Sequence, residues 1–195
     1  MESVDRADPR ADDGADDGAD DGNVEARARF EAIAREVIEP VRRFLARRTD
    51  PATADDALAE TLLVCWRRYD ELPAEPLPYA YGVARRCLAN AERGARRQRR
   101  VAGKIATLDP PRETPEPVGD DRLAEAMDAL PPDDAELLRL WAWEQLTAGE
   151  IATVLEITPN AASIRLHRAK EKLRTALRKV DAAAGHEDPK GGGRT

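Results

Sequence analysis

Apolar residues recur at helical spacing along most of this chain, and the alternation typical of β-strands is hard to find. One apolar stripe contains Val37, Val41, Phe44 and Leu45, in a segment that Pro40 leaves as one helix or divides into two. The pattern predicts an all-α protein with two small helical domains joined by a flexible, Pro-rich linker. The expected helices cover residues 24–48, 53–69, 79–100, 120–130 and 132–144, with two more between residues 147 and 180.

The last two predicted helices have the layout of a helix-turn-helix, whose second helix enters the DNA major groove. Thr147 and Glu150 form a capping box, and Thr158 with Pro159 signals the start of the second helix. A solvated amphipathic helix in a bundle is the alternative. The expected buried side contains Leu166, Ala169, Leu173, Leu177 and Val180, and the polar side contains Asn160, Ser163, Arg165, His167, Arg168 and Lys170.

Composition divides the chain into five segments. Residues 1–22 contain the repeat ADDG-ADDG-ADDG and are expected to be disordered, because dense like charge and few apolar residues do not favour a packed core. A helical domain at 23–100 is followed by a linker at 101–119, a helix-turn-helix domain at 120–180 and a disordered tail at 181–195. Inside the first domain, Asp70–Pro78 contains three prolines and is expected to be a loop.

Charge is distributed unevenly along the chain. The net charge of −7 lies entirely in residues 1–22, which hold nine acidic residues and two arginines. This tail is interpreted as solubilising, or alternatively as a DNA mimic that screens the chain's own basic helices. Residues 85–100 hold seven arginines and one glutamate, a density that favours binding to nucleic acid over a merely solvated helix face.

Other classes of function find little support in the sequence. Cys65 and Cys87 lie at apolar helical positions and are expected to be buried thiols, which fits a reducing cytoplasm. Neither His167 nor His186 forms a cluster with them, so no metal or other cofactor is expected. No 18-residue apolar run, signal peptide, P-loop or nucleophile motif is found, so we expect neither a membrane span nor an enzyme.

Two blocks of the chain resemble bacterial sigma factors of the extracytoplasmic-function (ECF) group. The domain that reads the promoter −35 element in that family is similar to LPPDDAELLRLWAWEQLTAGEIATVLEITPNAASIRLHRAKEKLR, residues 130–174. The −10-reading domain is similar to DDALAETLLVCWRRYDEL at 55–72 and PYAYGVARRCLANAERGARRQRR at 78–100. The resemblance implies a non-catalytic subunit that binds core RNA polymerase, recognises both elements of promoter DNA and helps to open the strands.

The resemblance also implies roles for individual residues. Contacts to −35 base edges fall on Ser163, Ile164, His167 and Arg168, and contacts to phosphates on Arg165 and Lys170. Ile164 could instead be a core residue. The loop at 70–77 would capture a flipped base, with Tyr79 and Tyr81 as stacking or packing partners, Tyr81 more as packing. The −10 backbone would be held by Arg85, Arg86, Arg93, Arg96 and Arg97, and core polymerase by Asp55, Asp56, Glu60 and Trp66.

Several points remain open at the level of sequence. Trp66 could equally be a plain core residue, and of Trp141 and Trp143 one is expected in the core and the other partly exposed. Departures from the family's usual strings occur at Ala59, Leu62, Tyr79, Ala80, Arg86, Glu156 and Ser163; Glu156 stands in the turn where the family often has glycine.

The two promoter elements lie roughly 80–90 Å apart. The linker extends to at most about 65 Å, so binding both elements at once requires it to be stretched. We expect a monomer when the chain is free. An anti-sigma factor is a further partner that the family allows. The alternative function is a stand-alone helix-turn-helix regulator of transcription.

Overall fold

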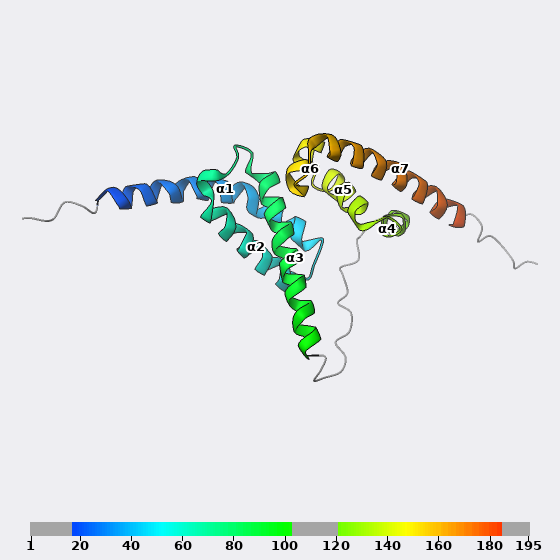
Figure 1. Ribbon diagram of the computed structural model, residues 1–195, viewed down its shortest axis with the longest axis horizontal. Coiled ribbons are helices and arrows are strands. Elements are labelled where there is room, and N and C mark those ends of the chain that lie inside the picture. The colour runs from blue at the N-terminus through cyan, green and yellow to red at the C-terminus, as the bar shows by residue number, and fades with distance from the viewer. Residues whose placement is uncertain (1–16, 103–120, 185–195) are drawn as a thin grey trace, which may run out of the picture.

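The computed structural model describes residues 17–102 and 121–184 (Figure 1). These two parts consist of seven α-helices and one short 3₁₀ helix, and no strand occurs within them. The all-α class predicted from the sequence is therefore confirmed. Most of the predicted linker and parts of both predicted tails lie outside the described residues.

The first domain consists of α1 (Asp17–Ala46), α2 (Pro51–Arg67), a 3₁₀ turn at Tyr69–Glu71 and α3 (Pro76–Ala102). All three α-helices pack against one another. The apolar stripe of α1 is fully buried, including Val41 and Phe44. Pro40 lies inside α1 without dividing it, so the one-helix interpretation of this segment is correct.

Several helix boundaries differ from the sequence prediction. α1 begins at Asp17, inside the segment for which disorder was predicted, and α3 begins at Pro76 rather than Tyr79. α2 begins at Pro51 because Asp50 is its N-cap, with a side-chain oxygen that accepts a hydrogen bond from the Thr53 amide at 3.1 Å. Asp50 and Pro51 thus start the helix. Proline fits the first helical position because it has no N–H group that would lack a hydrogen-bond partner there.

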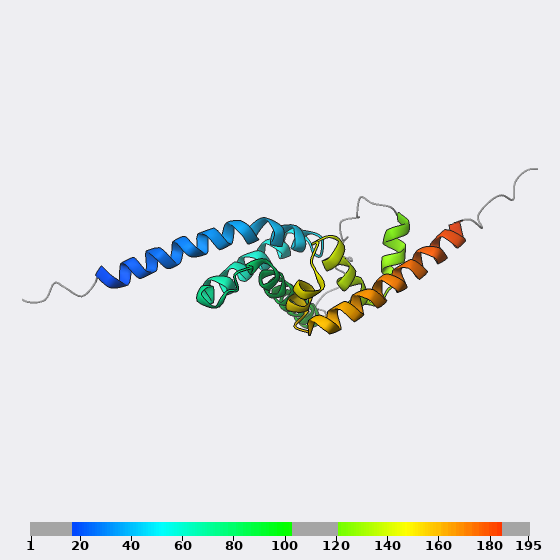
Figure 2. The same ribbon diagram turned by 90° about the horizontal axis from the view of Figure 1, so that it is seen from above.

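The second domain consists of α4 (Asp121–Asp128), α5 (Pro132–Ala142), α6 (Ala148–Leu155) and α7 (Pro159–Ala184). α7 contacts α4, α5 and α6. The view from above shows it as a long helix that projects past the rest of the domain (Figure 2). It continues to Ala184, so the first residues of the predicted C-terminal tail are helical.

The two domains pack directly against each other through α3 and α6. A Cβ atom added at Gly82 of α3 would lie 3.4 Å from the carbonyl oxygen of Val154 in α6, so the two backbones approach closely here. The buried apolar side chains of both domains form one hydrophobic cluster. The structure is therefore a closed arrangement in which the −10-like and −35-like modules touch.

A cluster of charged side chains around the buried carboxylate of Glu144 joins the same two domains. Glu144, which follows α5, has a side chain only 2% exposed and accepts from Arg47 at 2.5 Å and from Arg48 at 3.2 Å. Arg48 also donates to Glu136 of α5 at 3.3 Å, and its guanidinium stacks on the Phe44 ring. Removing one member would leave another charge buried without its full set of partners. We call Arg47, Arg48, Glu136 and Glu144 the charge cluster.

Candidate nucleic-acid interface

The turn between α6 and α7 is built by local hydrogen bonds. Thr147 and Glu150 form the capping box that the sequence predicted, with the Thr147 amide donating to the Glu150 carboxylate at 2.7 Å. Glu156 ends α6 in the left-handed conformation, with φ of 55°. Thr158 then accepts a hydrogen bond from the Ala161 amide at 3.2 Å, which caps the start of α7. These bonds set the angle at which α7 leaves the turn.

The first half of α7 has the two faces that the sequence predicted. Ala162, Leu166 and Ala169 are buried against α5 and α6. Leu173, Leu177 and Val180, predicted to be buried, are only partly so, because α7 extends past most of the domain. Ile164 is 44% exposed, so the core alternative for this residue is wrong. The predicted base-contacting and phosphate-contacting residues on the exposed face are Ser163, Ile164, Arg165, His167 and Arg168.

Two tryptophans flank this face instead of entering the core. Trp141 is 42% and Trp143 43% exposed, so the expectation that one of them is buried is wrong. The ammonium of Lys170 lies 3.5 Å from the centroid of the Trp141 ring, an arrangement that favours the cation through the ring's negative face. Trp143 lies beside the guanidinium groups of Arg47 and Arg139. Both rings therefore hold cations at the surface.

The arginines of α3 form the second basic surface. Arg93 donates to the Asn90 side chain at 2.6 Å, and Arg96 pairs with Glu92 at 3.3 Å. Such exposed pairs within one helix are weak and leave the guanidinium groups accessible. The predicted backbone-contacting arginines on the exposed surface of α3 are Arg85, Arg86, Arg93, Arg96 and Arg97.

The two tyrosines assigned to the −10 contact differ in position. Tyr79 is partly buried at the edge of the contact between the domains. Tyr81 is 3% exposed and packs against the Phe44 ring at a centroid distance of 5.1 Å, so its side chain packs in the core and is not available to stack on a base. Burial, with the nearby Glu144 carboxylate as a further cause, raises the pKa of Tyr81 to about 12.

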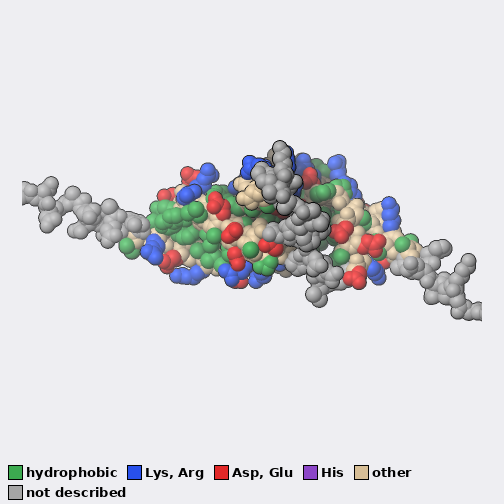
Figure 3. Space-filling model, turned by 90° about the horizontal axis from the view of Figure 1, so that it is seen from below, with side chains coloured by type: hydrophobic (Ala, Val, Ile, Leu, Met, Phe, Trp, Pro, Cys, Tyr) green, Lys and Arg blue, Asp and Glu red, His purple; other side chains and the backbone are tan. Residues whose placement is uncertain are grey.

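The acidic surface of α2 is exposed as predicted, at Asp55, Asp56 and Glu60. Trp66 lies farther along α2 in a partly buried aromatic group, 5.1 Å from Phe30 and 5.7 Å from Tyr69 between ring centroids. Hydrophobic side chains gather over this half of the molecule, where α1 and α2 lie (Figure 3). Trp66 thus packs against α1 and keeps part of its ring at the surface.

Cys65 and Cys87 are free, buried thiols, as the sequence predicted. Burial raises the pKa of Cys65 to about 11 and also raises the pKa of Cys87. Within residues 17–102 and 121–184, no group of histidine, cysteine and carboxylate side chains is suited to a metal ion. None of the helices in these ranges is both long and apolar enough to span a membrane.

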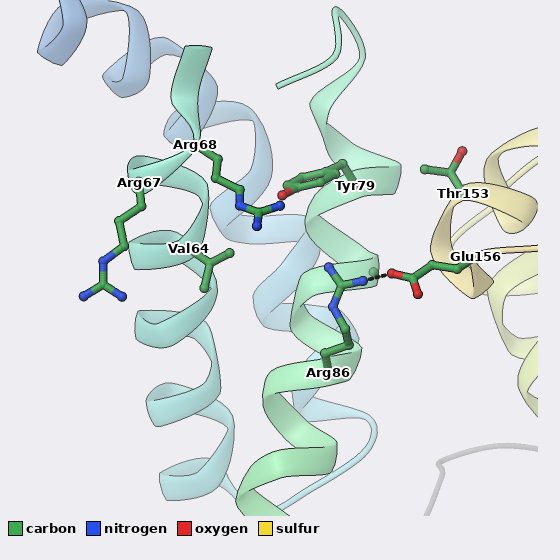
Figure 4. Close-up of a pocket in the computed structure, with 8 residues that line it drawn as sticks. Val64, Arg67, Arg68, Tyr79, Arg86, Thr153 and Glu156 are labelled. Atoms are coloured by element: carbon green, nitrogen blue, oxygen red, sulfur yellow. Dashed lines mark hydrogen bonds and ion pairs between the residues drawn. The ribbon is translucent and has the colours of Figure 1, made fainter. Parts of the chain in front are cut away.

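A cavity of about 630 Å³ lies where α2, α3 and α6 meet (Figure 4). Arg68 and Tyr79 point toward each other across it, and Arg86 of α3 donates to the carboxylate of Glu156 at the end of α6. Arg86 and Glu156 are two of the positions where the sequence departs from the sigma-factor strings, and the structure brings them into contact. The cavity is lined by Val64, Arg67, Arg68, Tyr79, Gly82, Arg86, Thr153 and Glu156.

Sequence reasoning missed the charge cluster. Arg47 and Arg48 precede a turn and Glu144 ends a helix, positions at which charged side chains are usually solvated. Their sequence separations of 96 and 97 residues give no local signal that they meet. A covarying arginine–glutamate pair in an alignment could have revealed the contact.

Comparison with known proteins agrees with this geometry. Residues 120–173 match the family model described as sigma-70, region 4. The chain is a homologue of RNA polymerase sigma factors. Over 140 residues it is 33% identical to the probable RNA polymerase sigma factor RfaY of Xanthomonas campestris pv. campestris, a match that covers 66% of this chain and 35% of the relative. This chain thus spans about a third of the length of that relative.

Solved structures of sigma factors share the fold. The sigma factor RpoE, in complex with the anti-sigma factor NepR from Bartonella quintana, aligns with a TM-score of 0.53 at 16% identity, covering 76% of this chain and 96% of that one. CnrH, in complex with the cytosolic domain of CnrY, aligns with a TM-score of 0.52 at 18% identity, covering 83% and 94%. At this identity, the likeness supports the all-helical fold alone.

Proposed function

We propose that this chain is a sigma factor: it binds core RNA polymerase, recognises −10 and −35 promoter elements and helps to open the DNA for transcription. The observation that carries the proposal is the sigma-70 region 4 match, because it falls on a helix-turn-helix whose second helix exposes a polar, basic face. The chain contributes specificity and the polymerase contributes the chemistry, so the chain is not itself an enzyme. It acts in the cytoplasm, where bacterial promoters are transcribed.

In the proposed complex, the exposed face of α7 reads the −35 element in the major groove. Arg168 and His167 reach base edges, together with Ser163 and Ile164, while Arg165 and Lys170 neutralise phosphates. The contact between Lys170 and the Trp141 ring supports its role as a phosphate ligand, because it holds the ammonium at the rim of the face.

The −10 element is assigned to α3 and the turn before it. Arg85, Arg86, Arg93, Arg96 and Arg97 hold the backbone, and Tyr79 stacks on a base displaced from the non-template strand. Tyr81 supports the site from the core. Core polymerase docks on the acidic surface of α2 and on the exposed part of Trp66.

Run-off transcription with bacterial core polymerase on a library of promoter fragments tests the proposal. The parent chain should direct initiation from a subset of fragments that share two elements. A double substitution of Asp55→Asn with Asp56→Asn should weaken the binding to core polymerase, while the matched change Glu36→Gln on the exposed surface of α1 should leave it unaltered. Core polymerase that initiates no better with the parent chain than without it would contradict the sigma-factor function.

A stand-alone regulator would bind an operator without polymerase, and no observation favours that alternative. An anti-sigma factor remains a proposed partner. It is supported by the structure of RpoE, which has the same fold and is bound there to the anti-sigma factor NepR. A free monomer is likewise proposed, to be checked by the molar mass in solution.

A further inference from the structure

We propose that the second domain blocks the −10-reading surface from within the chain, with the Glu156 carboxylate bound at Arg86 in place of a DNA phosphate. The inference builds on the proposed sigma-factor function and adds an intramolecular competitor to it. It concerns the closed arrangement of the free chain and names the residue that competes.

The backbone of Glu156 gives the first observation. Its φ of 55° and ψ of 43° lie in the left-handed region, where glycine is favoured and most other side chains are disfavoured. A glutamate is not the residue that this turn requires for its conformation. Its side chain points out of α6 toward α3, which places a carboxylate on the other domain (Figure 4).

The surroundings of that carboxylate give the second observation. The cavity that Glu156 enters is lined by three arginines, Arg67, Arg68 and Arg86, and by no acidic residue other than Glu156 itself. A carboxylate and a phosphate both accept charge-assisted hydrogen bonds from a guanidinium group. The surroundings that attract Glu156 therefore also suit the backbone of a nucleic acid, and the two compete for Arg86.

The fit of α6 on α3 gives the third observation. An added Cβ at Gly82 would lie 3.4 Å from the carbonyl oxygen of Val154, so the backbone of α6 lies directly against this face of α3. Thr153 and Glu156 line the cavity from α6, opposite Tyr79 and Arg86. A DNA strand that reaches Tyr79 must therefore displace the end of α6.

The contact is suited to reversible blocking. Arg86 and Glu156 are both well exposed, and exposed ion pairs are weak and sensitive to salt. By linkage, a strand that binds Arg86 loosens the domain contact, and loosening the domain contact favours the strand by the same factor. Opening would also let the modules move apart to the spacing of the promoter elements.

The test compares Glu156→Gln with Glu171→Gln in the full chain. Both changes remove one exposed carboxylate of the second domain, but among the described residues the ion pair of Glu171 is with Arg174 on its own helix. Binding of a fluorescein-labelled single-stranded DNA pool of random sequence is measured by anisotropy without polymerase. Glu156→Gln should bind about fivefold more tightly than the parent, at the lower end of typical coupling, and Glu171→Gln should bind like the parent.

Energy transfer between dyes measures opening directly. One dye is attached at Gly94→Cys on α3, where an added Cβ meets nothing within 4 Å, and the other at Thr175→Cys, an exposed position of α7. Glu156→Gln should lower the transfer efficiency. The exchanged pair Arg86→Glu with Glu156→Arg should restore it, because the ion pair is rebuilt with its charges reversed.

Equal DNA affinity and equal transfer efficiency in Glu156→Gln and Glu171→Gln would overturn the inference. The transcription assay keeps this result separate from the proposed function. If the parent directs initiation but the two variants behave alike, the blocking contact is wrong and the sigma-factor function stands. If no protein directs initiation but Glu156→Gln still gains DNA affinity, the function is wrong and the blocking contact stands.

Discussion

The two basic surfaces of this chain differ in what covers them. On α7, the predicted DNA-contacting side chains from Ser163 to Arg168 are exposed. On α3, the first half meets α6 at Gly82 and Arg86, and only the half with Arg93, Arg96 and Arg97 is free. In the closed arrangement the proposed −35 surface is therefore available, and the proposed −10 surface is only partly so.

The contacts that create this difference are themselves of two kinds. The charge cluster is centred on the buried Glu144 carboxylate, which two arginines hold, and it ties the end of α1 to α5. The pair of Arg86 and Glu156 is exposed and lies at the cavity. Removing one partner of a buried charge strongly destabilises a protein, whereas an exposed ion pair contributes little to stability. We infer that the cluster holds the domains together and that the exposed pair governs access to α3.

The largest effect is expected from Arg48→Met, which keeps an unbranched apolar side chain and removes the guanidinium that stacks on Phe44. Glu144 and Glu136 then lose a buried partner, at a cost of about 3 kcal/mol. Because separation of the domains returns both carboxylates to water, the loss should appear first as opening. Small-angle scattering should show a larger radius of gyration, with the helical signal in circular dichroism unchanged.

Opening by Arg48→Met should make the proposed −10 surface on α3 as accessible as the proposed −35 surface on α7. Single-stranded DNA binding should rise, as is expected for Glu156→Gln, and −35 duplex binding should not change. Arg42→Met is the matched control, because Arg42 is exposed and its ion pair in residues 17–102 and 121–184 is with Glu39 of its own helix. An unchanged radius of gyration in Arg48→Met would show that apolar packing alone closes the domains.

Arg168→Ala tests the free surface. It should cost about 1–3 kcal/mol in promoter binding and relax the preference at one −35 position, because a base-edge contact is lost. Arg178→Ala, farther along the exposed side of α7, controls for the loss of one positive charge. Binding titrations against promoter variants with each −35 position changed provide the measurement. Loss of affinity spread evenly over all variants would place Arg168 on the phosphates.

Arg96→Ala tests the half of α3 that α6 leaves free. It should weaken promoter binding evenly across sequences and reduce the slope of log affinity against log salt by about 0.7 to 0.9, the amount for one phosphate contact. The same change should leave the energy transfer between the domains unaltered, since the ion pair of Arg96 within the described parts of the chain is with Glu92 of its own helix. A salt slope equal to that of the parent would remove Arg96 from the DNA contact.

The helical pattern was predictable because its signals are local. The capping box at Thr147 and the proline at the start of α7 act within one turn, and both predictions are confirmed. The start of α2 was misplaced because Asp50 and Thr53 are both good capping residues, and the structure uses the first. Pro40 shows the limit of a local rule, since packing of α1 on two helices preserves the helix through it.

The contact between the domains could not be predicted from the sequence. It depends on residues such as Arg47 and Glu144, 97 positions apart, whose charges predict solvated surfaces when each segment is taken alone. The same cause explains the error at Trp141 and Trp143, which were expected to divide between core and surface. In the structure both remain at the surface because Lys170, Arg139 and Arg47 lie against their rings.

Tyr81 provides the smallest expected effect and a direct probe of the closed interface. Its pKa is raised to about 12, mainly by burial and then by the charge of Glu144. The folded protein keeps the phenol proton above the unfolded pKa of about 10, so this contribution to stability is complete below pH 10 and is lost as the pH rises toward 12. Absorbance titration of the three tyrosines should contain a late component that Tyr81→Phe removes. The pKa of Tyr69 is also raised, first by burial and then by its hydrogen bond with Asp70, so the part of the late titration that survives in Tyr81→Phe belongs to Tyr69. The Cys65 thiol, with a pKa of about 11, also contributes stability that is lost over this pH range, so the comparison of the parent with Tyr81→Phe isolates the contribution of the tyrosine.

In Arg48→Met the late component should move to lower pH, because opening returns the phenol to water. A late component that stays in place there would mean that Tyr81 is buried by the first domain alone.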